Sequence, residues 1–190
     1  MSSSENRLPA TPSQTVGPYF SIGLQPLFRS DIASDNCSGH PITIEGRVLD
    51  SQGQPVPDAM LEIWQAGPEG RYSGFIPKAT TGPCGFGRIA TNDDGEFRFT
   101  TIKPGIVADP SGARHAPHLN ITVFMRGLLR HLFTRLYFAG EPANEHDPVL
   151  QWVPAERRQT LMAAAANSET SALQWNIILQ GKHETVFFEW

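Results

Sequence analysis

The stretch Ile42-Thr43-Ile44-Glu45-Gly46-Arg47-Val48 alternates apolar or small residues with polar ones. Side chains on a β-strand point to opposite faces in turn, so this period of two predicts a strand with one buried face. The turn-forming residues 51–55 follow, and residues 60–64 are predicted as the next strand. This pattern of strand, turn and strand is typical of a sheet folded around a single core.

Further strands are predicted where alternating, β-branched or aromatic residues lie between turns. These strands are residues 97–99, 119–125, 132–138, 174–180 and 185–188, with hairpin turns at 92–95 and 181–182. The chain holds 17 Gly and 16 Pro in 190 residues, which favours a turn-rich fold over a helical bundle. We therefore expect an all-β fold, an antiparallel Greek-key β-sandwich with long loops, an N-terminal arm and little helix.

The chain is predicted to divide at its first long strand. Residues 1–41 are expected to form an N-terminal arm and loop, because they start with a polar stretch rich in Ser and Pro. Residues 42–190 are expected to form the β-sandwich domain. Within that domain, the Gly- and Pro-rich residues 65–88 are predicted as a long loop, and a loop of that length is usually functional.

Charge and composition argue against several classes of protein. The formal net charge of −4 disfavours a nucleic-acid-binding protein, which normally carries a basic surface. The longest apolar run, residues 161–166, is far shorter than the roughly 20 residues that span a bilayer. No secretory signal is visible at the N-terminus, so we expect a cytoplasmic protein in which Cys37 and Cys84 are free thiols.

Short motifs with chemistry-bearing residues follow one another along the chain. They are TPSQTVGPY (11–19), Glu62-Ile63-Trp64-Gln65-Ala66, Gly70-Arg71-Tyr72, Thr101-Ile102-Lys103-Pro104-Gly105, Ala116-Pro117-His118-Leu119-Asn120, Arg135-Leu136-Tyr137-Phe138 and QGKHETVFFEW (180–190). In this order and spacing they resemble the intradiol ring-cleaving dioxygenases over nearly the whole chain. The two terminal motifs are similar to those of an α-type subunit of that family.

The resemblance implies a ferric centre in the family, held by two tyrosine phenolates and two histidines, which are suitable ligands for iron. Tyr72 matches the first tyrosine and His118 the first histidine. Val107 stands at the second tyrosine position and Asn120 at the second histidine position. Valine cannot coordinate a metal and a neutral amide is a poor replacement for imidazole, so we expect these degenerate positions to bind no iron and this chain alone to hold no catalytic residue.

The resemblance further implies that this chain pairs with a β subunit, which binds the Fe(3+) of the assembled enzyme. By motif, the residues expected to line the substrate pocket between the subunits are Thr15, Gly17, Pro18, Tyr72 and Arg126. The implied reaction cleaves protocatechuate with O₂ to 3-carboxy-cis,cis-muconate. Protocatechuate carries a carboxylate, which Arg binds bidentately, so Arg126 is the expected carboxylate ligand.

Two other functions stay open at this point: a stand-alone intradiol dioxygenase with an unusual ligand set, and a non-enzymatic β-sandwich binding module. Without the family context, Tyr72 would be a packed loop aromatic, and His118 is best explained as a hydrogen-bonded histidine at a strand end. Arg126, Arg130, His131 and Arg135 would ordinarily form a solvated basic cluster, and the tryptophans Trp64, Trp152, Trp175 and Trp190 are predicted to lie in the core or an interface.

Residues 154–166 are the one ambiguous segment. Their alanines and N-terminal Pro favour a helix by intrinsic propensity. The resemblance implies instead a short helical turn followed by a strand near residues 160–165, which is the prediction we adopt. Because the chain is expected to be half of a functional unit, it is also predicted to be poorly soluble without its partner.

Overall fold

The computed structural model describes residues 11–15, 17, 19–33, 39, 41–72, 85–165 and 172–189, and most of the regular structure in them is β-strand. The strands are β1 (Pro41–Leu49), β2 (Met60–Gln65), β3 (Phe86–Ala90), β4 (Glu96–Ile102), β5 (Val107–Ala108), β6 (Arg114–His115), β7 (His118–Phe124), β8 (Leu132–Phe138), β9 (Met162–Ala165), β10 (Ala172–Gln174) and β11 (Ile177–Ile178). The helices are short: α1 (Tyr19–Leu24), α2 (Pro148–Trp152) and the 3₁₀ segments η1 (Gln25–Leu27), η2 (Pro142–His146) and η3 (Ala155–Leu161).

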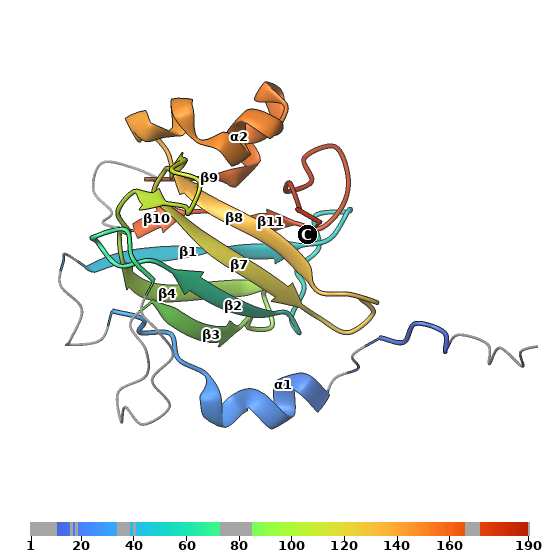
Figure 1. Ribbon diagram of the computed structural model, residues 1–190. Helices are drawn as coiled ribbons and strands as arrows, with labels where there is room; N and C mark the ends of the chain where they lie inside the picture. The colour runs from blue at the N-terminus through green and yellow to red at the C-terminus, as the bar shows by residue number, and fades with distance from the viewer. Residues whose placement is uncertain are drawn as a thin grey trace, which may run out of the picture.

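Nine of the strands form one sheet that nearly closes on itself (Figure 1), and β5 and β6 form a separate two-stranded sheet. The order of the larger sheet runs β11-β1-β10-β9-β8-β7-β2-β3, and β4 pairs with the other side of β1. Residues 29–33 bridge the two remaining edges, because the Arg29 amide donates to Arg88 of β3 at 2.7 Å and the Ile32 amide donates to Thr100 of β4 at 2.8 Å. This segment was expected to be an irregular loop, and it instead helps to close the barrel-like sheet.

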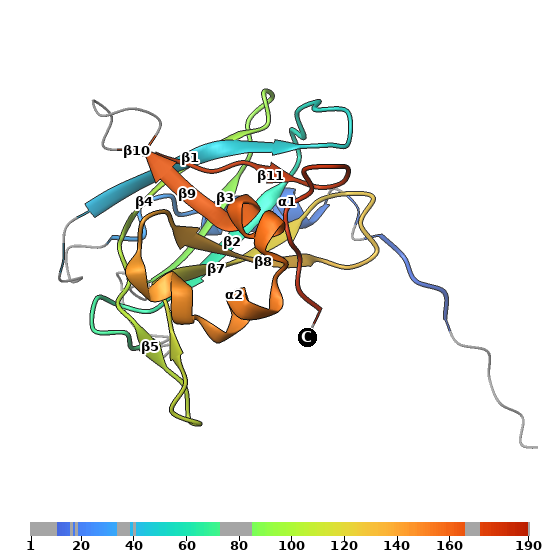
Figure 2. The ribbon, with the colours of Figure 1, turned by 90° about the horizontal axis from the view of Figure 1, so that it is seen from above.

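The expectation of a purely antiparallel sheet is wrong at three pairings. Strand β1 runs parallel to both β10 and β11, and β8 runs parallel to β9. A parallel pair needs a long crossover, and the segment η2-α2-η3 supplies it between β8 and β9, as the view from above shows (Figure 2). The mostly-β fold with little helix is confirmed, while the Greek-key sandwich arrangement stays a prediction.

Most strands predicted from the sequence are present in the structure. It confirms β1, β2, β4, β7 and β8, and the helical turn η3 followed by β9, while the predicted strand at 174–180 is divided between the end of β10 and β11. Strand β3 was predicted as part of a long loop, and helix α1 was not predicted at all. Residues 185–188 form an isolated bridge from Phe188 to Phe133 in place of the expected hairpin strand.

The turn at residues 92–95 forms as predicted, but it does not join two paired strands. The Gly95 amide donates to the Asn92 carbonyl at 2.9 Å. Strand β3 then pairs with β2, whereas β4 pairs with β1. The turn therefore carries the chain from one part of the sheet to another, because residues 29–33 take the place between β3 and β4.

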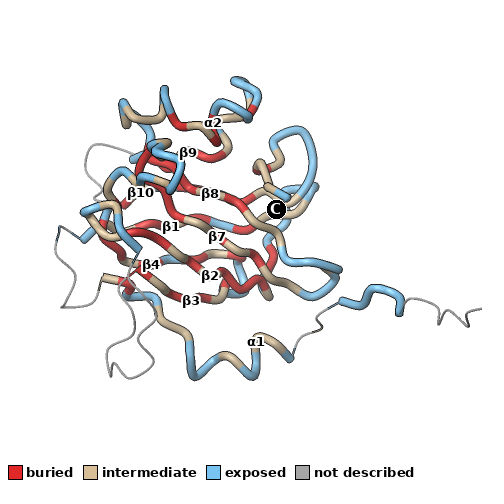
Figure 3. The backbone as a smooth tube through the Cα atoms, in the orientation of Figure 1, coloured by how far each residue is buried: buried red, intermediate tan, exposed pale blue. Residues whose placement is uncertain are grey.

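The core lies inside the curved sheet, where the inward-facing residues of the long strands are buried (Figure 3). A second, smaller apolar cluster lies under α2; it consists of Ala116, Tyr137, Leu150, Val153 and Leu161. Trp175 belongs to the main core, as predicted, whereas Trp152 is 75% exposed and lies outside it. Cys37, Cys84 and Trp190 lie outside the described residues. None of the helices that the structure describes is long and apolar enough to cross a membrane.

Candidate functional site

The residues singled out from the sequence lie at the two ends of strand β7. From His118 to Phe124 the strand rises about 20 Å, at roughly 3.3 Å per residue. Tyr72, His118 and Asn120 meet at its first end, and we call them the remnant cluster. Beyond its other end lies the Arg126 site, which consists of Thr15, Asp58, Arg126 and Gly127.

The remnant cluster is held together by its own hydrogen bonds. His118 and Asn120 are two residues apart on β7 and therefore lie on the same face of the strand. The Asn120 Nδ2 donates to the Tyr72 Oη at 2.9 Å, and the Tyr72 Oη lies 3.4 Å from His118 Nε2. The indole of Trp64, which faces Asn120 across β2 and β7, stacks on the Tyr72 ring at 6.0 Å and 7°.

The second ring nitrogen of His118 determines its tautomer. His118 Nδ1 lies 2.7 Å from the carbonyl oxygen of Ala116. A carbonyl only accepts, so Nδ1 carries the proton and Nε2 accepts from the Tyr72 hydroxyl. The prediction of a hydrogen-bonded histidine at a strand end is therefore confirmed.

Burial keeps both ring groups of the remnant cluster neutral. Burial raises the pKa of Tyr72 above its usual value, although donation from Asn120 and the charge of Arg135 act in the opposite direction. Burial and, next, the charge of Arg135 lower the pKa of His118 to about 4. At neutral pH the cluster thus presents a phenol, an imidazole and an amide.

The residues at the four family positions do not fit ferric iron. Val107 lies in β5 opposite His115 of β6 and offers no donor atom. The donor atoms of Tyr72 and His118 bond to each other, and the raised pKa of Tyr72 opposes the phenolate form that a ferric ion prefers. Across the described residues, the structure places no group of three or more His, Cys, Asp or Glu side chains where they could share a metal ion.

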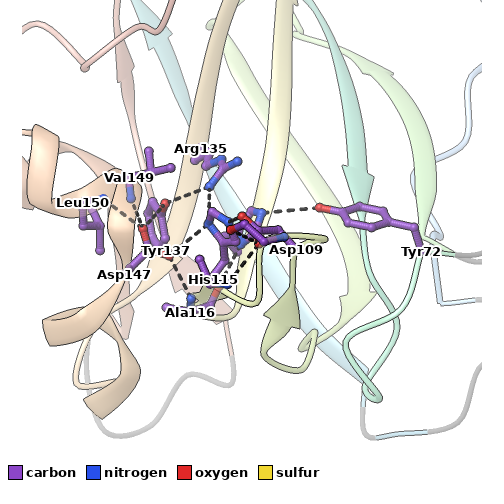
Figure 4. A network of polar contacts seen from close by, with 12 residues as sticks. Tyr72, Asp109, His115, Ala116, Arg135, Tyr137, Asp147, Val149 and Leu150 are labelled. Carbon is purple, nitrogen blue, oxygen red and sulfur yellow. Dashed lines mark hydrogen bonds and ion pairs between the residues drawn. The ribbon is translucent and has the colours of Figure 1, made fainter.

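Next to the remnant cluster lies a buried network that the sequence did not reveal (Figure 4). Asp147 is fully buried and is the N-cap of α2, accepting from the amides of Val149 and Leu150 at 2.9 Å each. It also accepts from the Ala116 amide at 2.8 Å and from the Tyr137 hydroxyl at 3.1 Å. The signal that could have indicated it is the Asp-Pro pair at 147–148, which is a common start of a helix.

His115 and Arg135 complete this network. His115 lies 3.5 Å from Asp109 Oδ2 and 3.8 Å from Asp147 Oδ2. The Nη1 of Arg135 lies 3.4 Å from both His115 Nδ1 and the Tyr137 hydroxyl. Without the family context, Arg135 would ordinarily belong to a solvated basic cluster, and the structure instead gives it part-buried polar partners, His115 and Tyr137.

The Arg126 site is built on the turn that joins β7 to β8. The Leu128 amide donates to the Met125 carbonyl at 3.4 Å, and Gly127 adopts a φ of +88°, which only glycine adopts readily. The Gly127 amide donates to Thr15 Oγ1 at 2.8 Å, so the N-terminal arm binds directly to this turn. The Gly17 amide lies 3.4 Å from the same Oγ1 atom.

The side chain of Arg126 is 63% exposed, and its Nε lies 2.9 Å from Asp58 Oδ2. Of the residues predicted to line a substrate pocket, the structure therefore brings together Thr15, Gly17 and Arg126. It places Tyr72 at the opposite end of β7, about 20 Å away, which a one-ring acid cannot bridge within one chain. Pro18 lies outside the described residues.

Similarity to known proteins covers almost all of this chain. The chain is 44% identical to the protocatechuate 3,4-dioxygenase alpha chain of Burkholderia cepacia, over 96% of this chain and 98% of that one. It is 41% identical to the alpha chain of the same name from Pseudomonas putida, over 96% of this chain and 97% of that one. The protocatechuate 3,4-dioxygenase beta chain of Burkholderia cepacia matches at 34% identity, over 77% of this chain and 67% of that one.

The fold agrees with these matches. The dioxygenase domain of a carbohydrate-binding fusion protein from Streptomyces sp. SirexAA-E superposes with a TM-score of 0.63, at 28% identity over 90% of this chain and 98% of that domain. The sequence profile of the family described as Dioxygenase matches residues 16–181. This chain therefore belongs to the intradiol ring-cleavage dioxygenase family.

Proposed function

We propose that this chain is the α subunit of a protocatechuate 3,4-dioxygenase. With its β subunit it would cleave protocatechuate with O₂ to 3-carboxy-cis,cis-muconate. The observation that carries the proposal is the identity of 41–44% to two alpha chains over 96% of this chain. In this proposal the β subunit holds the ferric iron, since the residues of the remnant cluster do not fit it.

The contribution of this chain is the recognition of the substrate. The guanidinium of Arg126 is exposed at the end of the sheet and carries a fixed positive charge. A carboxylate bound there would gain two parallel charge-assisted hydrogen bonds. Thr15 and Gly17 lie beside the same turn, so the arm lines this pocket, together with Pro18 by motif. Tyr72 belongs instead to the remnant cluster.

Iron analysis tests how the two subunits divide the work. The chain is purified alone and together with its β subunit, and iron content and turnover of protocatechuate are measured for both. We expect iron and turnover only in the assembled enzyme. Stoichiometric ferric iron in the isolated chain would contradict the proposal in favour of a stand-alone enzyme, and an assembly without iron or turnover would favour a binding module.

Arg126→Ala in the assembled enzyme tests the substrate contact. Loss of a hydrogen-bonded charge pair costs about 1.5–3 kcal/mol, so we expect the KM for protocatechuate to rise about 10- to 100-fold. Arg130→Ala, which removes an exposed arginine four residues away, is the matched control and should leave KM within about twofold. An unchanged KM in a correctly assembled Arg126→Ala enzyme would remove Arg126 from the pocket.

A further inference from the structure

Asp58 is the charged group that the structure places against Arg126. It lies in the turn before β2, and β2 pairs with β7, so the two residues meet at the same end of the sheet. Its Oδ2 atom is buried and receives no hydrogen bond of good geometry from the described part of the chain. The guanidinium of Arg126, with its Nε at 2.9 Å, compensates the charge of this oxygen.

The backbone that carries Asp58 is fixed from inside the sheet. The buried Thr91 donates from its hydroxyl to the Val56 carbonyl at 2.8 Å and accepts from the Ala59 amide at 3.1 Å. The Thr91 amide in turn donates to the Ala59 carbonyl at 2.9 Å. The backbone is therefore held by hydrogen bonds on both sides of Asp58, at residues 56 and 59. This restricts the positions that the Asp58 carboxylate can reach.

Arg126 is fixed at its backbone from the opposite side. The hydrogen bond from the Gly127 amide to Thr15 Oγ1 holds the turn in which Arg126 lies. Its side chain is long and exposed, and such a chain has about 2 kcal/mol of rotamer entropy to lose when it is ordered. An anchor at Nε removes part of that freedom before any ligand binds.

We propose that Asp58 is a positioning residue for substrate recognition, which holds Arg126 by Nε and leaves its two terminal nitrogens for the substrate carboxylate. This inference rests on the proposed function, in which Arg126 binds that carboxylate. The shortest contact of this ion pair joins the Arg126 Nε to Asp58 Oδ2, and none of the hydrogen bonds among the described residues involves the terminal nitrogens of Arg126. A guanidinium can bind a carboxylate through this terminal pair, so both contacts are compatible.

Two effects of Asp58 on an anionic substrate oppose each other, and they predict opposite results. The negative charge of Asp58 repels the substrate, so removing it would lower KM if repulsion dominated. The anchor restricts the guanidinium, so removing it would raise KM if positioning dominated. Because the Asp58 charge is compensated by Arg126 at 2.9 Å, we expect positioning to dominate.

The test is a double-mutant cycle in the assembled enzyme with Asp58→Ala, Arg126→Ala and the double variant. We expect Asp58→Ala to raise the KM for protocatechuate about fivefold with kcat within about twofold. Asp58→Asn, which keeps an acceptor oxygen, should have a smaller effect. In the Arg126→Ala background, Asp58→Ala should change KM no further. The inhibition constant of catechol, the same ring without the carboxylate, should not follow these changes.

Glu96→Gln is the matched control, since it removes a carboxylate that pairs with an exposed arginine, Arg47, elsewhere on the sheet. Assembly and iron content are checked for every variant. An unchanged or lowered KM in Asp58→Ala, with Arg126→Ala still impaired, would overturn the role of Asp58 and leave the proposed function intact. An equal loss from Asp58→Ala in both backgrounds would also overturn it. If Arg126→Ala itself has no effect, the carboxylate contact of the proposed function fails, and the role of Asp58 fails with it.

Discussion

Both ends of β7 carry polar side chains, but the chain uses them in opposite ways. At the first end, Tyr72, His118 and Asn120 bond to one another, and His118 is almost fully buried. At the other end, Arg126 is 63% exposed and its shortest contact with Asp58 is made by Nε. Polar groups whose hydrogen bonds are satisfied inside the chain act as structure, whereas an exposed charge with donors to spare can bind a ligand.

The largest change would convert the remnant cluster into a metal centre. Two ligands at right angles, each about 2.0–2.1 Å from one ion, lie about 2.9 Å apart. The Tyr72 Oη lies at comparable distances, 2.9 Å from Asn120 and 3.4 Å from His118. His118 also donates its other nitrogen to a carbonyl, as metal-binding histidines usually do. We therefore expect Val107→Tyr combined with Asn120→His to bring bound ferric iron to about one per chain.

Metal analysis and the visible absorption of an iron–phenolate centre measure this outcome without any assay of activity. The matched control is Val107→Phe combined with Asn120→His, which has the same ring without the hydroxyl and should bind much less iron. If the first double variant folds and stays free of iron, the geometry of the remnant cluster does not suit a metal ion. Its similarity to the family's ligand positions is then one of sequence alone.

A smaller but still large effect is expected at Asp147, which is linked to His118 of the remnant cluster through the backbone of Ala116. Asp147→Ala leaves three backbone amides and the Tyr137 hydroxyl without their acceptor. Burial raises the pKa of Tyr137 above its usual value, so this residue stays a phenol and needs an acceptor. We expect a loss of about 3–5 kcal/mol of stability, comparable to removing one partner from a buried charged network.

Hydrogen exchange at the amides of Ala116, Val149 and Leu150 measures the local effect of this substitution in the assembled enzyme. Exchange should become faster there, while amides at the Arg126 end keep their rates. Asp147→Asn, which retains one acceptor oxygen, should be intermediate. Equal acceleration at both ends of β7 would show that the two regions are not independent.

The smallest of these effects is the pH dependence of stability that His118 causes at the first end of β7. The pKa of His118 is about 4 in the folded chain and about 6.5 when unperturbed. Between these values the unfolded chain binds a proton that the folded chain rejects, so stability falls as pH falls from about 6.5 to 4. The free energy of unfolding that the wild type loses between pH 6.5 and pH 4 should be smaller in His118→Gln, by up to about 3 kcal/mol.

Thermal melting of the assembled enzyme between pH 7 and pH 4 measures that difference. His131→Gln is the control, because His131 lies in the turn near Arg126, where it contacts the Phe124 ring at 5.6 Å. An equally steep pH dependence in wild type and His118→Gln would show that protonation of another group controls acid stability.

Sequence periodicity predicted the long strands because each of them buries one face against the core. It did not predict β3, in which Gly87 resembles a loop residue. A Cβ atom at Gly87 would lie 2.5 Å from Ile32 Cγ1, so this glycine is required where residues 29–33 pack against β3. Residues 174–180 were predicted as one strand, whereas the structure has two short strands there, β10 with three residues and β11 with two. Their parallel pairing with β1 was not predicted, because segments this short show no period.

The candidate sites divide in the same way. The sequence alone determined the chemistry: which donor atoms stand at the metal positions, that Val107 and Asn120 weaken them, and that Arg126 can bind a carboxylate. Tertiary structure alone decided which of these residues meet. It separated Tyr72 from Arg126, joined Thr15 to Gly127 and brought Asp58 to Arg126. Residue type sets the chemistry of a group, but strand pairing between distant segments sets its neighbours, and no local pattern encodes that register.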